Sequence, residues 1–160
     1  MRMTVYVGTA FLLAVFVACT PKADQGSPAQ SPTPTGPAKG FDIKVTSVER
    51  VKEWRPTPKG VRGLLLVRGV SLVMGQGFTA DAGYELAVVH MNIKRVAEGA
   101  TLALSDVVAI DDKGEKHSTV YQYEPLGEEA EEPRDFIFPV KTGTSLKKIQ
   151  LAPDVSIDLP

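Results

Sequence analysis

The segment 84–95 constrains the fold more than any other part of this chain. It reads Tyr-Glu-Leu-Ala-Val-Val-His-Met-Asn-Ile-Lys-Arg. One set of alternate positions holds Ala87, Val89, Met91 and Ile93, and the other set holds Leu86, Val88, His90 and Asn92. A period of two is typical of a β-strand. We therefore expect a long strand over residues 84–95 with one buried face and a second face that is partly covered.

Shorter apolar runs separated by turn residues follow this segment. They predict strands over residues 102–110, 116–123, 135–140, 146–151 and 155–159, with a loop over 125–133. The positions expected to share the face of the first of these strands are Leu102, Leu104, Val108 and Ile110. Asp111-Asp112-Lys113-Gly114 predicts a hairpin turn, because Asp and Gly tolerate the positive φ of such turns.

The part of the chain before residue 84 has a less regular strand pattern. Residues 41–51 alternate, but their phase slips, which predicts a β-bulge near Thr46 and Ser47. The prolines after Trp54 end this strand, since proline cannot donate to a ladder. The apolar runs 64–67 and 70–74 fit either a tight pair of strands or one bent strand. No segment shows a helical period with caps, so we predict an all-β fold, a β-sandwich.

Length and composition suit a single domain of this kind. The chain has 160 residues, 43% of them hydrophobic, and a formal net charge of -1. A near-neutral charge argues against nucleic-acid binding, which normally requires a basic patch. One cysteine excludes an intramolecular disulfide. The core must therefore be stabilised by burial of apolar surface alone.

The N-terminal residues are typical of export. Met1-Arg2 is followed by an uncharged apolar run over 5–18, which is shorter than the ~20 residues of a membrane-spanning helix. The run ends in Phe-Val-Ala-Cys at Cys19, which resembles the lipobox of bacterial lipoproteins. This resemblance implies a signal peptide over 1–18 and lipidation of Cys19. The protein would then be anchored to the cell membrane or outer membrane, with its domain facing the periplasm or the exterior. An ordinary secreted protein and an uncleaved anchor are the alternatives.

Residues 19–40 are rich in Pro, Gly, Ser and Thr and nearly free of large apolar side chains. Such a segment cannot offset the entropy of ordering, so we expect a flexible tether. The folded domain is then expected over residues 41–160.

The strand pattern resembles a known family in three places. These are the strand 88–94, the hairpin 104–116 with its acidic-Lys-Gly turn, and the Asp-Phe-Ile-Phe-Pro-Val strand ending at Val140. Together they resemble the immunoglobulin-like domains of small bacterial lipoproteins, which share a fold with secreted mycobacterial immunoprotective antigens. The resemblance implies an envelope-exposed immunoglobulin-like sandwich and assigns no catalytic residues.

The sequence does not predict an enzyme. Ser71 lacks the second glycine of a Gly-x-Ser-x-Gly elbow, and Gly75-Gln76-Gly77 lacks the third glycine and the helix of a dinucleotide site. We expect no cofactor and no dedicated metal site. The alternative is a copper or zinc site that uses His90 and His117 with Met74 or Met91 as soft partners.

Two features are candidates for partner binding. Six carboxylates crowd residues 124–135 against one cation, Arg134: Glu124, Glu128, Glu129, Glu131, Glu132 and Asp135. We interpret them as a solvated loop and, as a hypothesis, as a surface that attracts a basic envelope protein or peptide. Glu128, Glu129, Glu131 and Glu132 are the expected contact residues. Trp54 is either an exposed binding aromatic or a residue packed at the sandwich rim. Asp106 falls in phase with buried positions, which favours a bulge or an edge position over a buried acid.

Overall fold

A computed structural model describes residues 34–35, 38, 40–73, 77–127 and 129–160 of the chain. This part contains β-strands and no helix, and every strand pairing in it is antiparallel. The strands are β1 (Pro34–Thr35), β2 (Phe41–Val51), β3 (Glu53–Trp54), β4 (Val61–Leu64), β5 (Val70–Val73), β6 (Gly77–Ala80), β7 (Tyr84–Arg95), β8 (Val108–Asp111), β9 (Lys116–Ser118), β10 (Tyr121–Tyr123), β11 (Glu131–Lys141), β12 (Leu146–Ala152) and β13 (Val155–Asp158). The predicted all-β class is confirmed.

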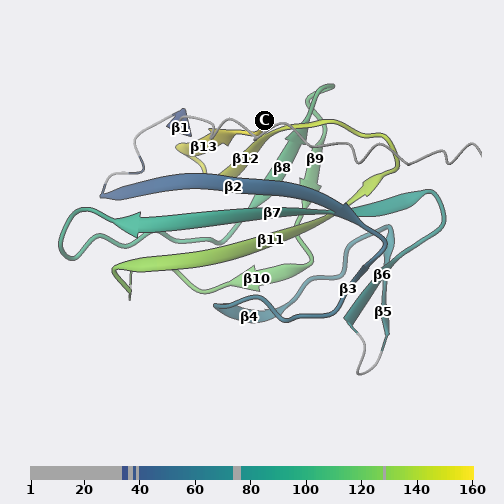
Figure 1. Cartoon of the computed structure of the whole chain (residues 1–160), viewed down its shortest axis with the longest axis horizontal. Coiled ribbons are helices and arrows are strands. Elements are labelled where there is room, and N and C mark those ends of the chain that lie inside the picture. Colours follow the sequence, from purple (N-terminus) through teal and green to yellow (C-terminus); the bar gives the residue numbers. More distant parts are fainter. Residues whose placement is uncertain (1–33, 36–37, 39, 74–76, 128) are drawn as a thin grey trace, which may run out of the picture.

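The centre of the molecule is a sheet of three long strands in the order β11–β7–β2 (Figure 1). β7 has the bounds predicted from its alternation. It pairs with β11 without interruption from Lys94↔Glu131 to Tyr84↔Lys141. Its pairing with β2 shifts register between Val45 and Ser47, so the predicted bulge is confirmed.

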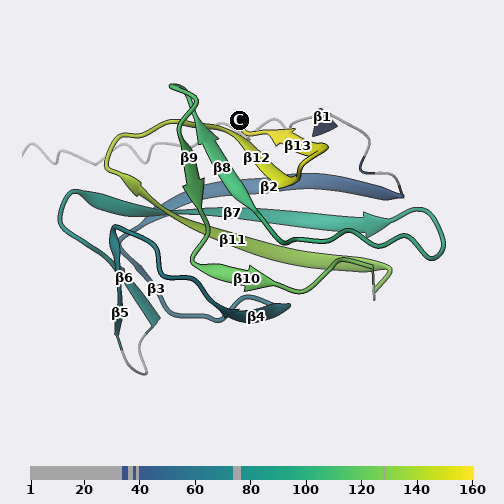
Figure 2. The same cartoon turned by 180° about the vertical axis from the view of Figure 1, so that it is seen from behind.

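A second sheet, in the order β1–β13–β12–β8–β9, lies across one face of the central sheet (Figures 1 and 2). The alternate residues of β7 that include Val89, Met91 and Ile93 are buried on that face. Ile149 and Ile157 of the second sheet are also buried. Two antiparallel layers with an apolar interior are consistent with the predicted β-sandwich.

The opposite face of β7 changes character along the strand. Leu86 and Val88 are fully buried, whereas His90 and Asn92 are only partly covered. A small sheet in the order β3–β6–β5 lies at the end of the long strands (Figure 1). Trp54 of β3 packs against the His90 ring, with centroids 6.1 Å apart. The prediction of partial cover is confirmed.

The middle of the chain forms neither arrangement left open by the sequence. β5 pairs with β6, which follows it, and the earlier run contributes β4, which pairs with β10. The apolar runs 64–67 and 70–74 are therefore neither paired with each other nor parts of one strand.

Two boundaries differ from the prediction. Within residues 102–110 the strand covers only 108–110, and Leu102 forms an isolated bridge to Leu126. The buried residues of β8 are Ala109 and Asp111, so the predicted face is wrong. Asp111 is tolerated inside because backbone amides of the hairpin hydrogen-bond to its carboxylate.

The return strand is also divided. The predicted strand over 116–123 splits into β9 and β10 as the chain leaves the second sheet, and Val120 N donates to Ile137 O of β11 (3.0 Å). The expected loop over 125–133 is shorter than predicted, since β11 begins at Glu131.

The segment 1–18 predicted as a signal peptide, Cys19 and most of the segment predicted as a tether lie outside the described residues. Within the described part, no helix is long and apolar enough to cross a membrane.

Candidate binding groove and acidic loop

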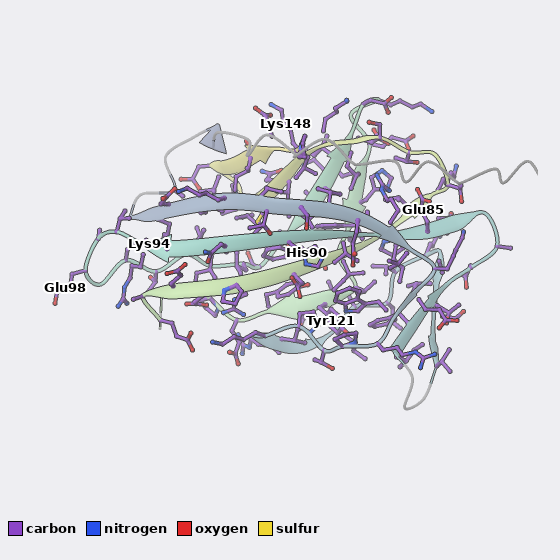
Figure 3. The ribbon with its side chains drawn as sticks, viewed as in Figure 1. Glu85, His90, Lys94, Glu98, Tyr121 and Lys148 are labelled. Atoms are coloured by element: carbon purple, nitrogen blue, oxygen red, sulfur yellow. The ribbon has the colours of Figure 1, made fainter. Side chains whose placement is uncertain are left out.

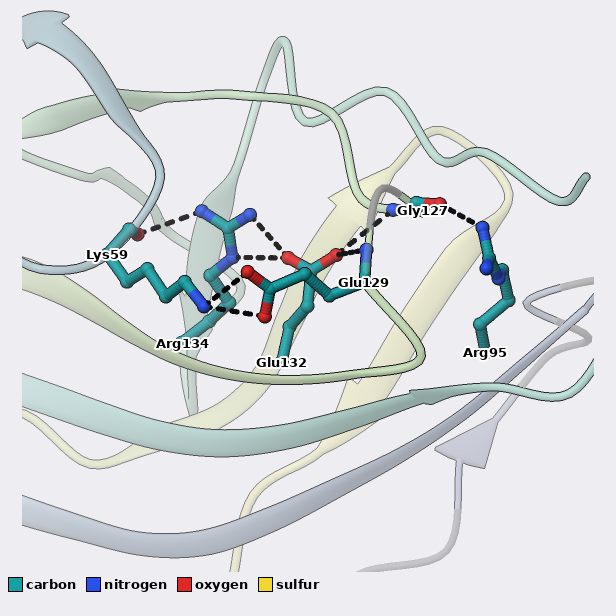
Figure 4. Close-up of polar contacts among 6 residues, drawn as sticks. All are labelled: Lys59, Arg95, Gly127, Glu129, Glu132 and Arg134. Atoms are coloured by element: carbon teal, nitrogen blue, oxygen red, sulfur yellow. Dashed lines mark hydrogen bonds and ion pairs between the residues drawn. The ribbon is translucent and has the colours of Figure 1, made fainter.

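A buried ion pair lies at the start of β11, next to the acidic loop. Glu132 and Arg134 are 3% and 5% exposed, which is rare for charged residues. Arg134 donates to Glu132 Oε2 from Nε (3.1 Å) and from Nη2 (2.5 Å), and from Nη1 to the backbone oxygen of Lys59 (2.8 Å; Figure 4). Gly60 has φ of 69°, and a Cβ there would lie 1.1 Å from Nη1. Glycine at position 60 therefore leaves the space that the guanidinium occupies.

The Glu132 carboxylate also organises the backbone of the loop. Its Oε1 accepts hydrogen bonds from the amides of Gly127 (3.2 Å) and Glu129 (3.3 Å). Burial by itself raises the pKa of this carboxyl, but the hydrogen bonds from Arg134 and from the two amides outweigh burial and lower the pKa. Arg95 donates to the backbone oxygen of Gly127 from the other side (Figure 4). The pair is therefore the internal support of the loop.

Other carboxylates of this region also have local partners. Glu129 forms an ion pair with Lys59 (2.6 Å), Asn92 donates to Glu131 (2.6 Å), and Asp135 contacts the His90 ring (2.7 Å). Glu128 lies outside the described residues. The interpretation of the whole run as solvated acids is wrong for Glu132, because this side chain points inward to Arg134. A partner cannot reach its carboxylate without breaking the buried pair.

Asp106 is exposed in an irregular segment, where Ser105 Oγ donates to it (3.1 Å). The expectation that it avoids the interior is confirmed, although it lies before β8 and not in a bulge.

The two histidines belong to different sites. His90 lies on the partly covered face of β7 (Figure 3), between Asp135 on β11 and Glu49 on β2, at 2.7 and 3.4 Å. His117 lies on β9 and contacts Asp111 at 3.1 Å. Met91 is buried on the opposite face of β7 from His90, and Met74 lies outside the described residues. The structure therefore does not assemble a site from the two histidines and a methionine.

A groove of about 640 Å³ separates β4 from the β5–β6 hairpin. The charged, aromatic and large apolar residues that line it include Arg55, Val61, Arg62, Leu64, Leu72, Phe78 and Tyr121. Leu64 and Leu72 are 51% and 57% exposed, whereas most large apolar side chains of the described part are covered. The groove thus offers apolar surface to solvent at two strands.

The floor of the groove is aromatic and rigidly supported. Phe78 and Tyr121 are buried and meet edge to face, with centroids 5.2 Å apart. Tyr121 lies on β10 next to β4 (Figure 3), and burial raises the pKa of its hydroxyl, so the ring stays neutral. Trp54 pairs in register with Phe78, and its Nε1 is buried without a hydrogen-bond acceptor in the described part of the chain. Trp54 is therefore a packed, half-buried support and not an exposed aromatic contact.

Both walls of the groove are sheet edges. Among the described residues β4 pairs only with β10, and β5 pairs only with β6. Arg55 and Arg62 are exposed at the rim, and no carboxylate of the described residues lines the groove. The sequence does not predict this groove, because the groove depends on two strands that each lack a second neighbour in the described part of the chain. The alternation of Arg62 and Leu64 was the local signal available.

Comparisons of the chain with protein-family models, with curated proteins and with solved structures find no match.

Proposed function

We propose that this protein is a lipid-anchored lipoprotein of the bacterial cell envelope. In this proposal its immunoglobulin-like domain binds an extended segment of another envelope protein in the groove between β4 and the β5–β6 hairpin. The export and lipid signals at residues 1–19 support the location. The observation that carries the binding role is the groove itself, where exposed leucines lie beside two strand edges that have no partner strand in the described part of the chain.

Exposed edges are the reason to expect an extended ligand. An edge strand presents unpaired backbone groups, and an added peptide strand can satisfy them. Leu64 and Leu72 would contact alternate side chains of that strand, because side chains of a strand point to opposite faces in turn. Leu64 and Leu72 are each about half exposed, so covering the rest of both side chains contributes about 1.5–3 kcal/mol before the loss of mobility is counted.

The charges of the groove define the ligand further. Arg55 already contacts Glu53 at the surface, but Arg62 has no ion pair within the described part of the chain. A segment that combines apolar and acidic residues fits this rim. The acidic loop is a weaker candidate for a basic partner, because Lys59 and Arg134 already compensate two of its carboxylates.

Peptide selection on the immobilised full chain tests this function. From a random peptide library we expect enrichment of segments with alternating apolar residues and at least one acid. Leu72→Asp should weaken binding of a selected peptide at least about tenfold, because it places a charge in an apolar contact. Val96→Asp is the matched control, since Val96 is 63% exposed but does not line the groove. Equal weakening by both changes, or enrichment of basic peptides, would contradict the proposal.

The location has a separate test. Changing Cys19→Ser should leave the chain as uncleaved precursor or release it from the membrane fraction, because lipidation requires the thiol. Cell fractionation and the size of the mature chain provide the measurement. A variant that matures and fractionates as the unchanged protein does would show that Cys19 is not the anchor.

A further inference from the structure

Three metal-binding side chains meet at the β8–β9 hairpin, away from the groove. Asp111 ends β8, Glu115 lies in the turn and His117 lies on β9. One potential ligand atom from each residue lies within 4.8 Å of the other two. We propose that this cluster is a zinc site.

The separation of the first two ligands fits a shared metal ion. Asp111 Oδ2 and His117 Nε2 are 3.1 Å apart. Two ligands bound to one tetrahedral zinc at about 2.0–2.1 Å are separated by about 3.3 Å. The ion would replace the proton that these atoms share and would lie to one side of the line that joins them, so their separation would need to change little. His117 then binds as neutral imidazole, and its Nε2 proton passes to solvent.

The hairpin holds Asp111 in place before any ion binds. Its Oδ1 accepts hydrogen bonds from the amides of Lys113 (2.9 Å) and Glu115 (2.8 Å). The residue is 5% exposed, so its second oxygen has few orientations available. These bonds support the first ligand as outer hydrogen bonds do in known metal sites.

Glu115 supplies the third ligand from the solvent side. Its side chain is exposed and lines two hollows, one beside Asp111 and the other beside His117. Each hollow reaches the cluster from solvent, which leaves a fourth position for water or for a ligand from another molecule. The two carboxylates also balance the charge of a divalent ion. Lys113, Lys116 and Lys141 lie around these hollows and lower the attraction of the site for cations.

The donor set selects among metals. One imidazole and two carboxylates suit zinc, whereas calcium and magnesium prefer oxygen ligands alone. The three ligands contain no sulfur atom, so the set does not favour Cu(I). This assignment differs from a site built on both histidines, since His90 has its own carboxylates on the central sheet.

The test uses the full chain in detergent with Cys19→Ser, so that a free thiol cannot bind metal. After chelation, titration with Zn²⁺ alone should show saturable binding of one equivalent and a rise in melting temperature. Co²⁺ should give the intense visible absorption of a four-coordinate site. Excess Ca²⁺ or Mg²⁺ should not displace either ion.

Single substitutions locate the site. His117→Gln and Glu115→Gln should each weaken zinc binding at least about tenfold. His90→Gln is the matched control and should leave the affinity unchanged. Glu115 is exposed, so its variant should fold even if a change at His117 disturbs the hairpin. Absence of saturable binding, loss of binding in His90→Gln, or unchanged binding in Glu115→Gln would each overturn the assignment.

Discussion

Replacing Arg134 by leucine should lower the free energy of unfolding by about 3–5 kcal/mol, the range for breaking a buried ion pair by removing one partner. The change leaves the Glu132 carboxylate buried, and the hydrogen bonds that remain to it among the described residues come from the amides of Gly127 and Glu129. It also removes the donor to the Lys59 backbone oxygen. Urea denaturation followed by circular dichroism measures this loss.

Lys59→Met is the matched control for this experiment. It removes the ion pair with Glu129, in which both side chains are about half exposed. Exposed pairs contribute about 0–1 kcal/mol, so this variant should remain close to the unchanged protein in stability. Adding Glu132→Gln to Arg134→Leu should recover part of the loss, since glutamine keeps an acceptor oxygen without a charge. If Arg134→Leu and Lys59→Met lowered the free energy of unfolding by similar amounts, the buried pair would contribute no more to stability than the exposed pair.

The pair also makes stability depend on pH. The pKa of Glu132 is lowered in the folded protein, from an unfolded value of about 4.3. Its contribution is therefore complete above about pH 4.3 and is lost as the pH falls through the folded pKa. The difference in free energy of unfolding between the unchanged protein and Glu132→Gln should become smaller as the pH falls through that acid range.

Substitutions at two positions on one face of β7 should lower the free energy of unfolding by unequal amounts. Val88→Asn should lower the free energy of unfolding by about 3–5 kcal/mol, because it removes buried apolar area and buries an amide without partners. Val88 is fully buried between Glu49 and Ile137 of the neighbouring strands. Chemical denaturation measures the free energy of unfolding, and a β-type circular dichroism spectrum before denaturation shows that the variant is folded.

Asn92→Val is the reciprocal control, four residues further along the same face. Asn92 is half-buried, and the change removes its contact with the exposed Glu131. The expected effect is within about 0.5 kcal/mol. Comparable effects at the two positions would mean that the small β3–β6–β5 sheet does not protect one end of this face more than the other.

Sequence reasoning succeeded where the structure follows from local pattern. β7 is long and uninterrupted, so its alternation predicts its bounds, its buried face and the partial cover of its other face. The bulge in β2 appears in the sequence as a slip of phase. The hairpin after β8 appears through its Asp and Gly residues.

Prediction from the sequence failed where the burial of a residue depends on partners that are distant in the sequence. Asp111 breaks the apolar alternation of β8, and only the folded hairpin shows how its charge is compensated. Glu132 resembles its acidic neighbours in the sequence, but it lies two residues before Arg134 on the same face of β11. The backbone of Lys59 completes that cluster from a remote segment. The groove depends in the same way on which strands have no neighbour.

The position of β7 at the centre of its sheet determines when the domain can fold. Its neighbours are β2, which precedes it, and β11, which is reached only after β8, β9 and β10. Closing two long loops is slow relative to forming a local hairpin, so folding times of milliseconds to seconds are typical of such topologies. A chain that emerges from a translocation channel N-terminus first would keep the apolar faces of β2 and β7 exposed until β11 arrived. During that interval an exported chain would be open to chaperones and proteases.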